Sequence, residues 1–307
     1  MTDKNIILVG APMDCGKRRD GCLMGPDAFR TAGLAAALSD LGHSVVDAGN
    51  VAPRANDIAD HDHLYCLPET VAWTTALAEK AESAMTDGFP IFLGGDHALS
   101  LGTTLGVSRA AAKADRPLFI LWLDAHTDYH TPLTTDSGNL HGTPVGYLAG
   151  RSDFDQFPTF ENPVPPQRIC MLGLRSVDPA ERDALHGTAV RSIDMRAIDE
   201  DGIVKPLSAF LADVAAANGM LHVSLDVDFL DPSVAPAVGT TVPGGATVRE
   251  GHLVMEMLSD SGLMTSLDLV ELNPFLDDRG RTAQLMVELT ASAFGRKVFD
   301  RPTRAFA

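Results

Sequence analysis

Three short apolar runs in this sequence each lead into side chains that can bind metal ions. The runs 118–123, 220–225 and 89–93 are followed, respectively, by Asp124, His126 and Asp128, by Asp226 and Asp228, and by Asp96 and His97. A short run without polar alternation is typical of a strand buried on both faces. Because alternate residues of an extended segment share a face, the acids and imidazoles after each run can converge on one point. A single such triplet could be a solvated loop, but its recurrence predicts a metal site.

The number and type of these groups indicate two metal ions. The expected ligands are four carboxylates and two imidazoles: His97, Asp124, His126, Asp128, Asp226 and Asp228. This set is too large for one closed zinc site and suits two divalent ions that share bridging oxygens. Four carboxylates also balance the charge of two divalent ions, which makes a partly buried cluster tolerable. Oxygen-rich ligation without sulfur favours manganese over zinc or copper.

The segments around these runs alternate between strand and helix patterns. Strands are expected at 5–9, 44–47, 89–93, 118–123, 168–172, 190–193, 220–225 and 263–271, and helices at 26–42, 68–86, 98–113, 142–150, 204–217, 248–259 and 284–294. This repetition predicts an α/β fold with a mostly parallel sheet and helices on both faces. Ligands of such open sheets collect outside the carboxyl ends of the strands, where the three runs end. Because no low-complexity linker interrupts the alternation, we expect a single domain over 1–307.

Composition restricts the expected partners and location. A net charge of −17 argues against nucleic acid and anionic membrane surfaces as partners. The four cysteines lack the Cys-x-x-Cys spacing, so we expect free thiols in a reducing compartment. No basic segment typical of a signal peptide precedes the first apolar run, and no run is long enough to cross a bilayer. These features predict a cytoplasmic protein. The HDH segment at 61–63 lies in a polar loop and is not expected to bind metal.

Several motifs together resemble those of the arginase, or ureohydrolase, family across essentially the whole chain. They are GGDH at 94–97, DAHTD at 124–128, SGNLHG at 137–142, SLDVDFLDP at 224–232 and ELNP at 271–274. The resemblance implies a three-layer α/β fold around an eight-stranded parallel sheet, two Mn²⁺ per chain, and assembly into trimers or hexamers. It also implies that a metal-bridging hydroxide hydrolyses a guanidinium group to urea and an amine. The loop TPLTTDSGNLHGTP resembles that of arginases more than that of agmatinases, which implies L-arginine as substrate and L-ornithine as product.

The resemblance assigns catalytic roles to three residues. His141 matches the family's acid/base histidine, and an imidazole on a glycine-flanked loop near metals is independently a plausible proton shuttle. Glu271 ends the run SLDLVEL, where a carboxylate can pair with a planar guanidinium through two hydrogen bonds. Asp128 is the ligand nearest to the departing amine and is expected to pass it a proton. The alternatives are a loop histidine satisfied by the backbone and a helix-capping acid.

A second group of residues matches the family's contacts to the amino-acid end of the substrate. Thr135, Ser137 and Asn139 are expected to bind the α-carboxylate, and Asp178 and Glu181 the α-amino group. Asp178 precedes Pro179 and could instead cap a helix. Thr240 matches a residue near the guanidinium but could equally be structural.

One departure from the family pattern leaves the substrate open. His130 stands where arginases commonly have asparagine beside the carboxylate, which supports a sister hypothesis of another guanidino substrate, such as guanidinobutyrate or agmatine. A deacetylase with a related sheet is a further class, although the acid pairs at 124 and 128 and at 226 and 228 favour two metals. A metal-binding protein without catalysis is the last alternative, and the presence of His141 and Glu271 argues against it.

Overall fold

The computed structural model describes residues 3–297, and its centre is one eight-stranded sheet in the order β2-β1-β3-β8-β7-β4-β5-β6. The strands are β1 Asn5–Ala11, β2 Ser44–Asn50, β3 Phe89–Gly94, β4 Leu118–Leu123, β5 Ile169–Leu174, β6 Arg191–Asp194, β7 Met220–Asp226 and β8 Met264–Val270. All neighbouring strands pair in parallel. The predicted parallel sheet is confirmed, and every expected strand is present.

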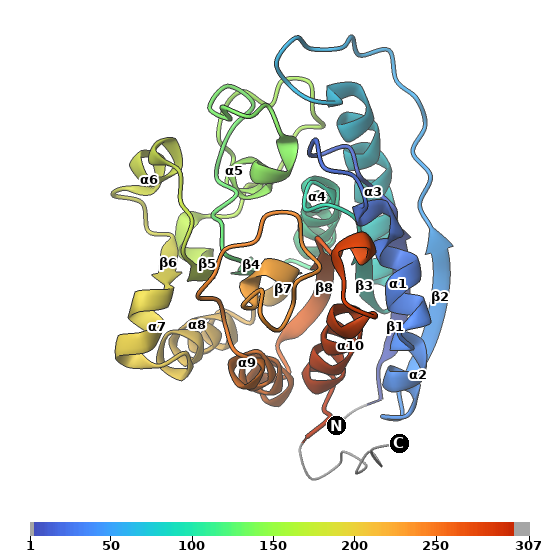
Figure 1. Ribbon diagram of the computed structural model, residues 1–307. Coiled ribbons are helices and arrows are strands. Elements are labelled where there is room, and N and C mark those ends of the chain that lie inside the picture. The colour runs from blue at the N-terminus through green and yellow to red at the C-terminus, as the bar shows by residue number, and fades with distance from the viewer. Residues whose placement is uncertain (1–2, 298–307) are drawn as a thin grey trace.

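Helices cover both faces of this sheet and bury two separate apolar clusters (Figure 1). The helices are α1 Gly25–Thr31, α2 Leu34–Ser39, α3 Leu67–Asp87, α4 Leu99–Lys113, α5 Pro144–Leu148, α6 Pro179–Leu185, α7 Met195–Asp201, α8 Val204–Ala216, α9 Val248–Ser261 and α10 Arg281–Ala293. One cluster includes side chains of α1, α2 and α7 to α10, and the other includes those of α3 to α5. The three expected layers are therefore present. None of the helices within residues 3–297 combines the length and apolar character needed to cross a bilayer.

The prediction of one helix over 26–42 was wrong. The structure has two short helices, because α1 ends at Thr31 and α2 begins at Leu34. Gly33 between them has a φ of 87°, in the left-handed region that glycine enters at little cost. Helix α7 had no clear sequence signal and was not predicted. Neither difference alters the carboxyl ends of the central strands.

The register of the sheet brings four strand ends to the same level. Leu93 of β3 pairs with Leu269 of β8, Leu269 with Leu225 of β7, and Leu225 with Leu123 of β4. The residue after each of these leucines therefore lies at one edge of the sheet. Because β8 separates β3 from β7, the segment that follows β8 lies among the metal-ligand candidates.

Candidate metal centre and active site

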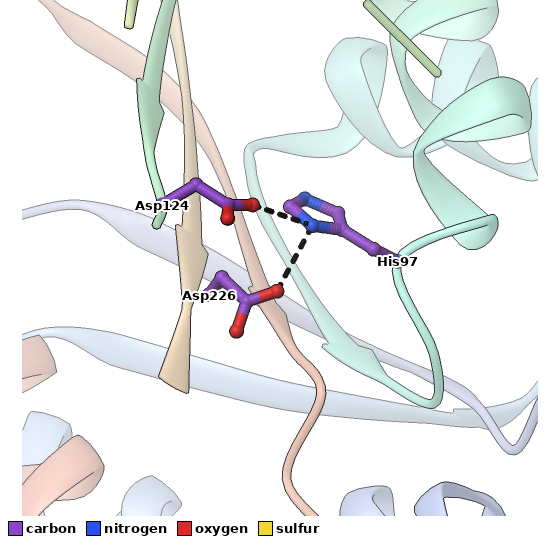
Figure 2. A group of neighbouring side chains, drawn as sticks. All are labelled: His97, Asp124 and Asp226. Atoms are coloured by element: carbon purple, nitrogen blue, oxygen red, sulfur yellow. Dashed lines mark ion pairs between the residues drawn. The ribbon is translucent and has the colours of Figure 1, made fainter. Parts of the chain in front are cut away.

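The first group of ligand atoms surrounds the imidazole of His97. Its Nδ1 lies 3.0 Å from Asp124 Oδ2 and 3.1 Å from Asp226 Oδ2 (Figure 2), and 3.1 Å from Asp128 Oδ2. Asp124 follows β4 directly and Asp226 ends β7, while His97 lies on the turn between β3 and α4. The level strand ends thus deliver three side chains to one point, as the sequence predicted.

The second group lies beside the first and shares a carboxylate with it. His126 Nδ1 is 3.3 Å from Asp124 Oδ1 and 3.0 Å from Asp228 Oδ2. Asp124 therefore directs one oxygen toward His97 and the other toward His126. A carboxylate with its oxygens divided between two ligand groups is suited to bridge two cations. All six predicted ligands are brought together in these two groups.

The electrostatics of these groups fit positively charged ions. Burial and the charge of Asp124 raise the pKa of Asp128 to about 6, and burial and the charge of Asp228 raise the pKa of Asp226 well above its usual value. His97 Nδ1 and Asp124 Oδ2 are buried and make no hydrogen bond. Crowded carboxylates with unsatisfied ligand atoms are stabilised when cations neutralise them. The donor set therefore fits two divalent ions.

Contacts behind the ligands hold them in place. His97 Nε2 lies 2.8 Å from Ser224 Oγ, and its ring stacks on Trp122 with centroids 4.2 Å apart. The strand ends also support one another, because Ala125 N–H donates to Asp228 Oδ1 at 2.9 Å. Hydrogen bonds to the second nitrogen of a ligating histidine fix the orientation of its ring. Ser224 and Trp122 therefore aim Nδ1 at the carboxylates.

Glu271 lies behind the metal ligands rather than at the wall of the cavity. Its Oε1 accepts the His97 N–H at 2.9 Å and lies 3.3 Å from His141 Nδ1, and its Oε2 pairs with the ammonium of Lys17. The side chain is 1 % exposed. Because other donors contact both oxygens, a guanidinium could pair with Glu271 at two points only by displacing some of them. Burial opposes ionisation of Glu271, but Lys17 and His141 outweigh it and lower the pKa well below its usual value.

A cavity of about 220 Å³ opens beside the metal-ligand candidates. Except for Asp228 and Glu271, every residue predicted for the site lines it. The cavity is also lined by three residues that were not predicted, Asp136, Gly142 and Ser176. All three lie within two residues of a predicted residue, and Gly142 ends the motif SGNLHG, but no role was assigned to them. The cavity thus connects the ligands to the residues expected to bind an amino acid.

His130 and Asp178 face each other at the far side of this cavity. His130 Nε2 lies 3.1 Å from Asp178 Oδ2, and its Nδ1 lies 3.1 Å from Thr134 Oγ1. Asp178 is also the N-cap residue of α6, and its N–H donates to Glu181 Oε2 at 3.2 Å. The two predicted roles of Asp178, as a helix cap and as a cavity residue, are therefore compatible. The carboxylate of Glu181 also accepts the N–H of Tyr129 at 2.8 Å.

Polar groups of the loop 135–139 form the adjacent wall. Thr135 Oγ1 lies 3.3 Å from Ser137 Oγ, which accepts the Asn139 N–H at 3.2 Å. Asn139 Oδ1 is buried without a hydrogen bond. Thr240 Oγ1 donates to Asp228 Oδ2 at 3.3 Å, so this hydroxyl contacts a metal-ligand candidate.

The HDH segment contacts a loop of the site. No group of three or more potential ligands within residues 3–297 includes His61, Asp62 or His63. Instead, His63 Nε2 lies 2.7 Å from the Thr135 carbonyl oxygen and braces the loop 135–139. Lys17 was also not predicted, because nothing in the sequence of a glycine-rich loop indicates that its lysine is buried. Both contacts join segments that are far apart in the chain.

An open parallel α/β sheet with two linked ligand groups at its carboxyl edge defines the class of α/β proteins with a binuclear metal centre. Within that class, the chain belongs to the arginase family, whose model matches residues 4–295. The family predicted from the motifs is confirmed.

Proteins named arginase resemble the chain over nearly its whole length. An arginase of Brucella melitensis biotype 1 is 58% identical over 302 residues, which cover 97% of this chain and 99% of the relative. An arginase of Bacillus subtilis is 38% identical and covers 96% of this chain and 99% of its own. The solved structure of the arginase from Bacillus caldovelox superimposes with a TM-score of 0.88 at 35% identity, covering 96% and 99% of the two chains.

Proposed function

We propose that this protein hydrolyses the guanidinium group of L-arginine to L-ornithine and urea. The observation that carries the proposal is the pair of ligand groups that share Asp124, beside a cavity that is also lined by polar and charged groups suited to an amino acid. The similarity to proteins named arginase supports the same substrate. No deacetylase or non-catalytic role accounts for both halves of this cavity.

Two Mn²⁺ per chain are the proposed cofactors. His97, Asp124, Asp128 and Asp226 would hold one ion, and Asp124, His126 and Asp228 the other. The oxygen-rich donor set without sulfur supports manganese. When bound, the ions supply a water of lowered pKa and positive charge for the developing anion.

The side chains of the cavity provide the remaining chemistry. Asp128 has its carboxylate at the wall of the cavity, so it can take a proton from the attacking water and pass it to the departing amine. His141 also lines the cavity and is partly exposed, so it can exchange that proton with solvent. His97 contacts the carboxylate of Asp128, and Gly16 and Glu271 contact His141, so both groups are held in place before the substrate binds.

Recognition of the amino acid is assigned to the far side of the cavity. Asp178 and Glu181 supply negative charge for the α-amino group, and His130 lies between them and the loop 135–139. Thr135, Ser137 and Asn139 supply polar groups for the α-carboxylate, and Thr240 acts through Asp228. A substrate without an α-amino or α-carboxylate group would leave these polar groups unpaired.

The second candidate function is hydrolysis of another guanidino compound, such as guanidinobutyrate or agmatine. It is favoured by one observation, the contact of His130 Nε2 with Asp178 Oδ2. The imidazole of His130 therefore already contacts the carboxylate that is proposed to bind an α-amino group. Guanidinobutyrate, which lacks the α-amino group, would leave the contact undisturbed, whereas agmatine keeps the amine and lacks only the carboxylate.

Urea release from arginine, agmatine, guanidinobutyrate and guanidinopropionate tests both candidates. Each unpaired buried polar group costs about 1 to 3 kcal/mol, so kcat/KM for arginine should exceed that for agmatine on the order of 10² or more. His130→Asn should preserve or raise this selectivity. A preference for a guanidino acid without an α-amino group would replace arginine as substrate and leave the ureohydrolase reaction standing.

We also propose that the protein is a cytoplasmic homo-oligomer, a trimer or hexamer, with no membrane or nucleic-acid partner. Leu23 and Met24 are 48% and 40% exposed and line one cavity with Pro274, which precedes the 75% exposed Phe275, and a contiguous apolar patch of this kind is typical of a protein contact surface. The net charge of −17 argues against anionic partners. Sedimentation equilibrium would measure the assembly, and a monomer at micromolar concentration would contradict it.

A further inference from the structure

Lys17 is a buried lysine on the loop between β1 and α1. It is 2% exposed, although lysine is almost never fully buried without a partner. Its ammonium pairs with Oε2 of Glu271, and Asp96 and the thiol of Cys22 are the next acidic groups that face it. The sequence-based view of the site gave Lys17 no role.

The partner of Lys17 connects it to the proton-transfer group. Glu271 uses its other oxygen, Oε1, to accept the His97 N–H at 2.9 Å and to contact His141 Nδ1 at 3.3 Å. Glu271 itself has a φ of 67°, a conformation that costs a non-glycine residue free energy and persists only where surrounding contacts enforce it. One carboxylate therefore links three loops at the carboxyl edge of the sheet.

The residue before Lys17 holds the same histidine by its backbone. The Gly16 carbonyl oxygen accepts the His141 N–H at 3.0 Å, and the Gly16 N–H donates to Asp96 Oδ2 at 2.7 Å. Two consecutive residues thus fix both ends of His141, Gly16 directly and Lys17 through Glu271. The contact between Lys17 and His141 through Glu271 requires that the Glu271 carboxylate is ionised and correctly oriented. The buried ammonium of Lys17 stabilises this state.

We propose that Lys17 is a positioning residue that orients His141 for proton transfer by holding Glu271. The inference rests on the proposed function, because His141 matters only if the protein moves a proton. The opposite arrangement would make Lys17 a competitor that the substrate guanidinium must displace from Glu271.

Kinetics of Lys17→Met separate these arrangements. If Lys17 positions His141, kcat falls by roughly 10- to 100-fold while KM changes less than about twofold, since a proton-transfer group is misplaced but the cavity is intact. If Lys17 competes with the substrate, KM falls and kcat is kept. Lys17→Arg, which retains the charge, should keep most of the kcat. Lys205→Met, which removes an exposed lysine paired with Asp201, is the matched control and should behave as wild type.

A double-mutant cycle with Glu271→Gln shows whether Lys17 acts through Glu271. When Lys17→Met is added to Glu271→Gln, kcat should fall by less than about a further twofold. The reason is that Glu271, through which Lys17 acts on His141, is already changed. This comparison also serves if the single Lys17→Met variant fails to fold, because the double variant leaves no unpaired buried charge. An independent, full-size loss of kcat in that background would overturn the proposal.

Two measurements do not depend on turnover. Metal content per chain should be unchanged in Lys17→Met, and a loss of metal would mean that Lys17 supports the ligand His97 instead. In metal-free protein, Lys17→Met should lower Tm by roughly 5 to 15 °C, and adding Glu271→Gln should recover part of this loss. Wild-type activity on arginine tests the proposed function separately, and the variants are compared on whichever guanidino compound the wild type turns over best.

Discussion

Asp124 is the residue on which the metal centre depends most. Its two oxygens contact the two ligand groups separately, and it follows a strand whose end lies level with those of its neighbours. The sequence predicted this residue and the other five ligands, because each follows an apolar run whose character is visible in the chain. The pairing of Glu271 with Lys17 was not predictable, since it depends on where a loop without strand or helix pattern folds back.

His141 is expected to move protons without binding metal. His141→Asn should lower kcat by roughly 10 to 10⁴ fold, the range for general acid/base groups, with metal content intact. The comparison variant is His186→Asn, which changes an exposed histidine outside the cavity and should leave both quantities unchanged. Loss of metal from His141→Asn would make His141 a ligand.

Metal retention should depend on pH through Asp128. Its pKa is raised to about 6 in the metal-free protein, by burial and then by the charge of Asp124. A proton on this carboxylate competes with a cation, so Asp128 alone should raise the apparent metal dissociation constant about tenfold when the pH falls from 7 to 5, and the raised pKa values of His97 and His126 should add to this rise. Equilibrium dialysis measures this change. A metal affinity that stays constant between pH 7 and pH 5 would show that metal binding does not displace a proton from Asp128.

At the scale of elements, the carboxyl ends of β3, β8, β7 and β4 form the site. Their order could not be read from the chain, because strands adjacent in the sheet are distant in sequence. What could be predicted was that parallel strands place their ends at one edge. The break between α1 and α2 was missed because the apolar spacing continues past Gly33, and only its backbone conformation ends the first helix.

A buried polar cluster fixes β8 against α4 beneath the site. Asp268 Oδ2 accepts hydrogen bonds from Ser100 Oγ at 2.7 Å and Thr103 Oγ1 at 2.8 Å, and His222 Nε2 lies 3.3 Å away. Asp268→Leu would leave these groups without their acceptor. We expect it to lower the free energy of unfolding by about 2 to 5 kcal/mol, measured by urea denaturation of metal-free protein.

The control for this variant is Asp201→Leu. Asp201 pairs only with the exposed Lys205 on the described surface, so its removal should cost less than about 1 kcal/mol. Equal effects of the two substitutions would show that the Asp268 cluster contributes no more than a surface ion pair.

At the scale of the whole molecule, the fold brings the metal-ligand candidates and the residues proposed to bind an amino acid to the lining of one cavity. The metal side comes from the central strands, and the other side comes from the loop 135–139 and the segment that begins α6. The metal side of the cavity could be predicted from the sequence, because its residues follow segments with strand patterns. The other side was identified only through the family resemblance, since loop residues have no periodicity that reveals where they lie.

The central claim is that the protein hydrolyses arginine when two metal ions are bound by the ligand groups beside this cavity. Its most direct test is a titration of metal-free protein with Mn²⁺, in which bound ions per chain are measured by elemental analysis and urea release from L-arginine is measured on the same samples. Urea release should rise until about two ions are bound per chain and should then stay constant. Full activity with one ion per chain, or no urea release with two, would contradict the central claim.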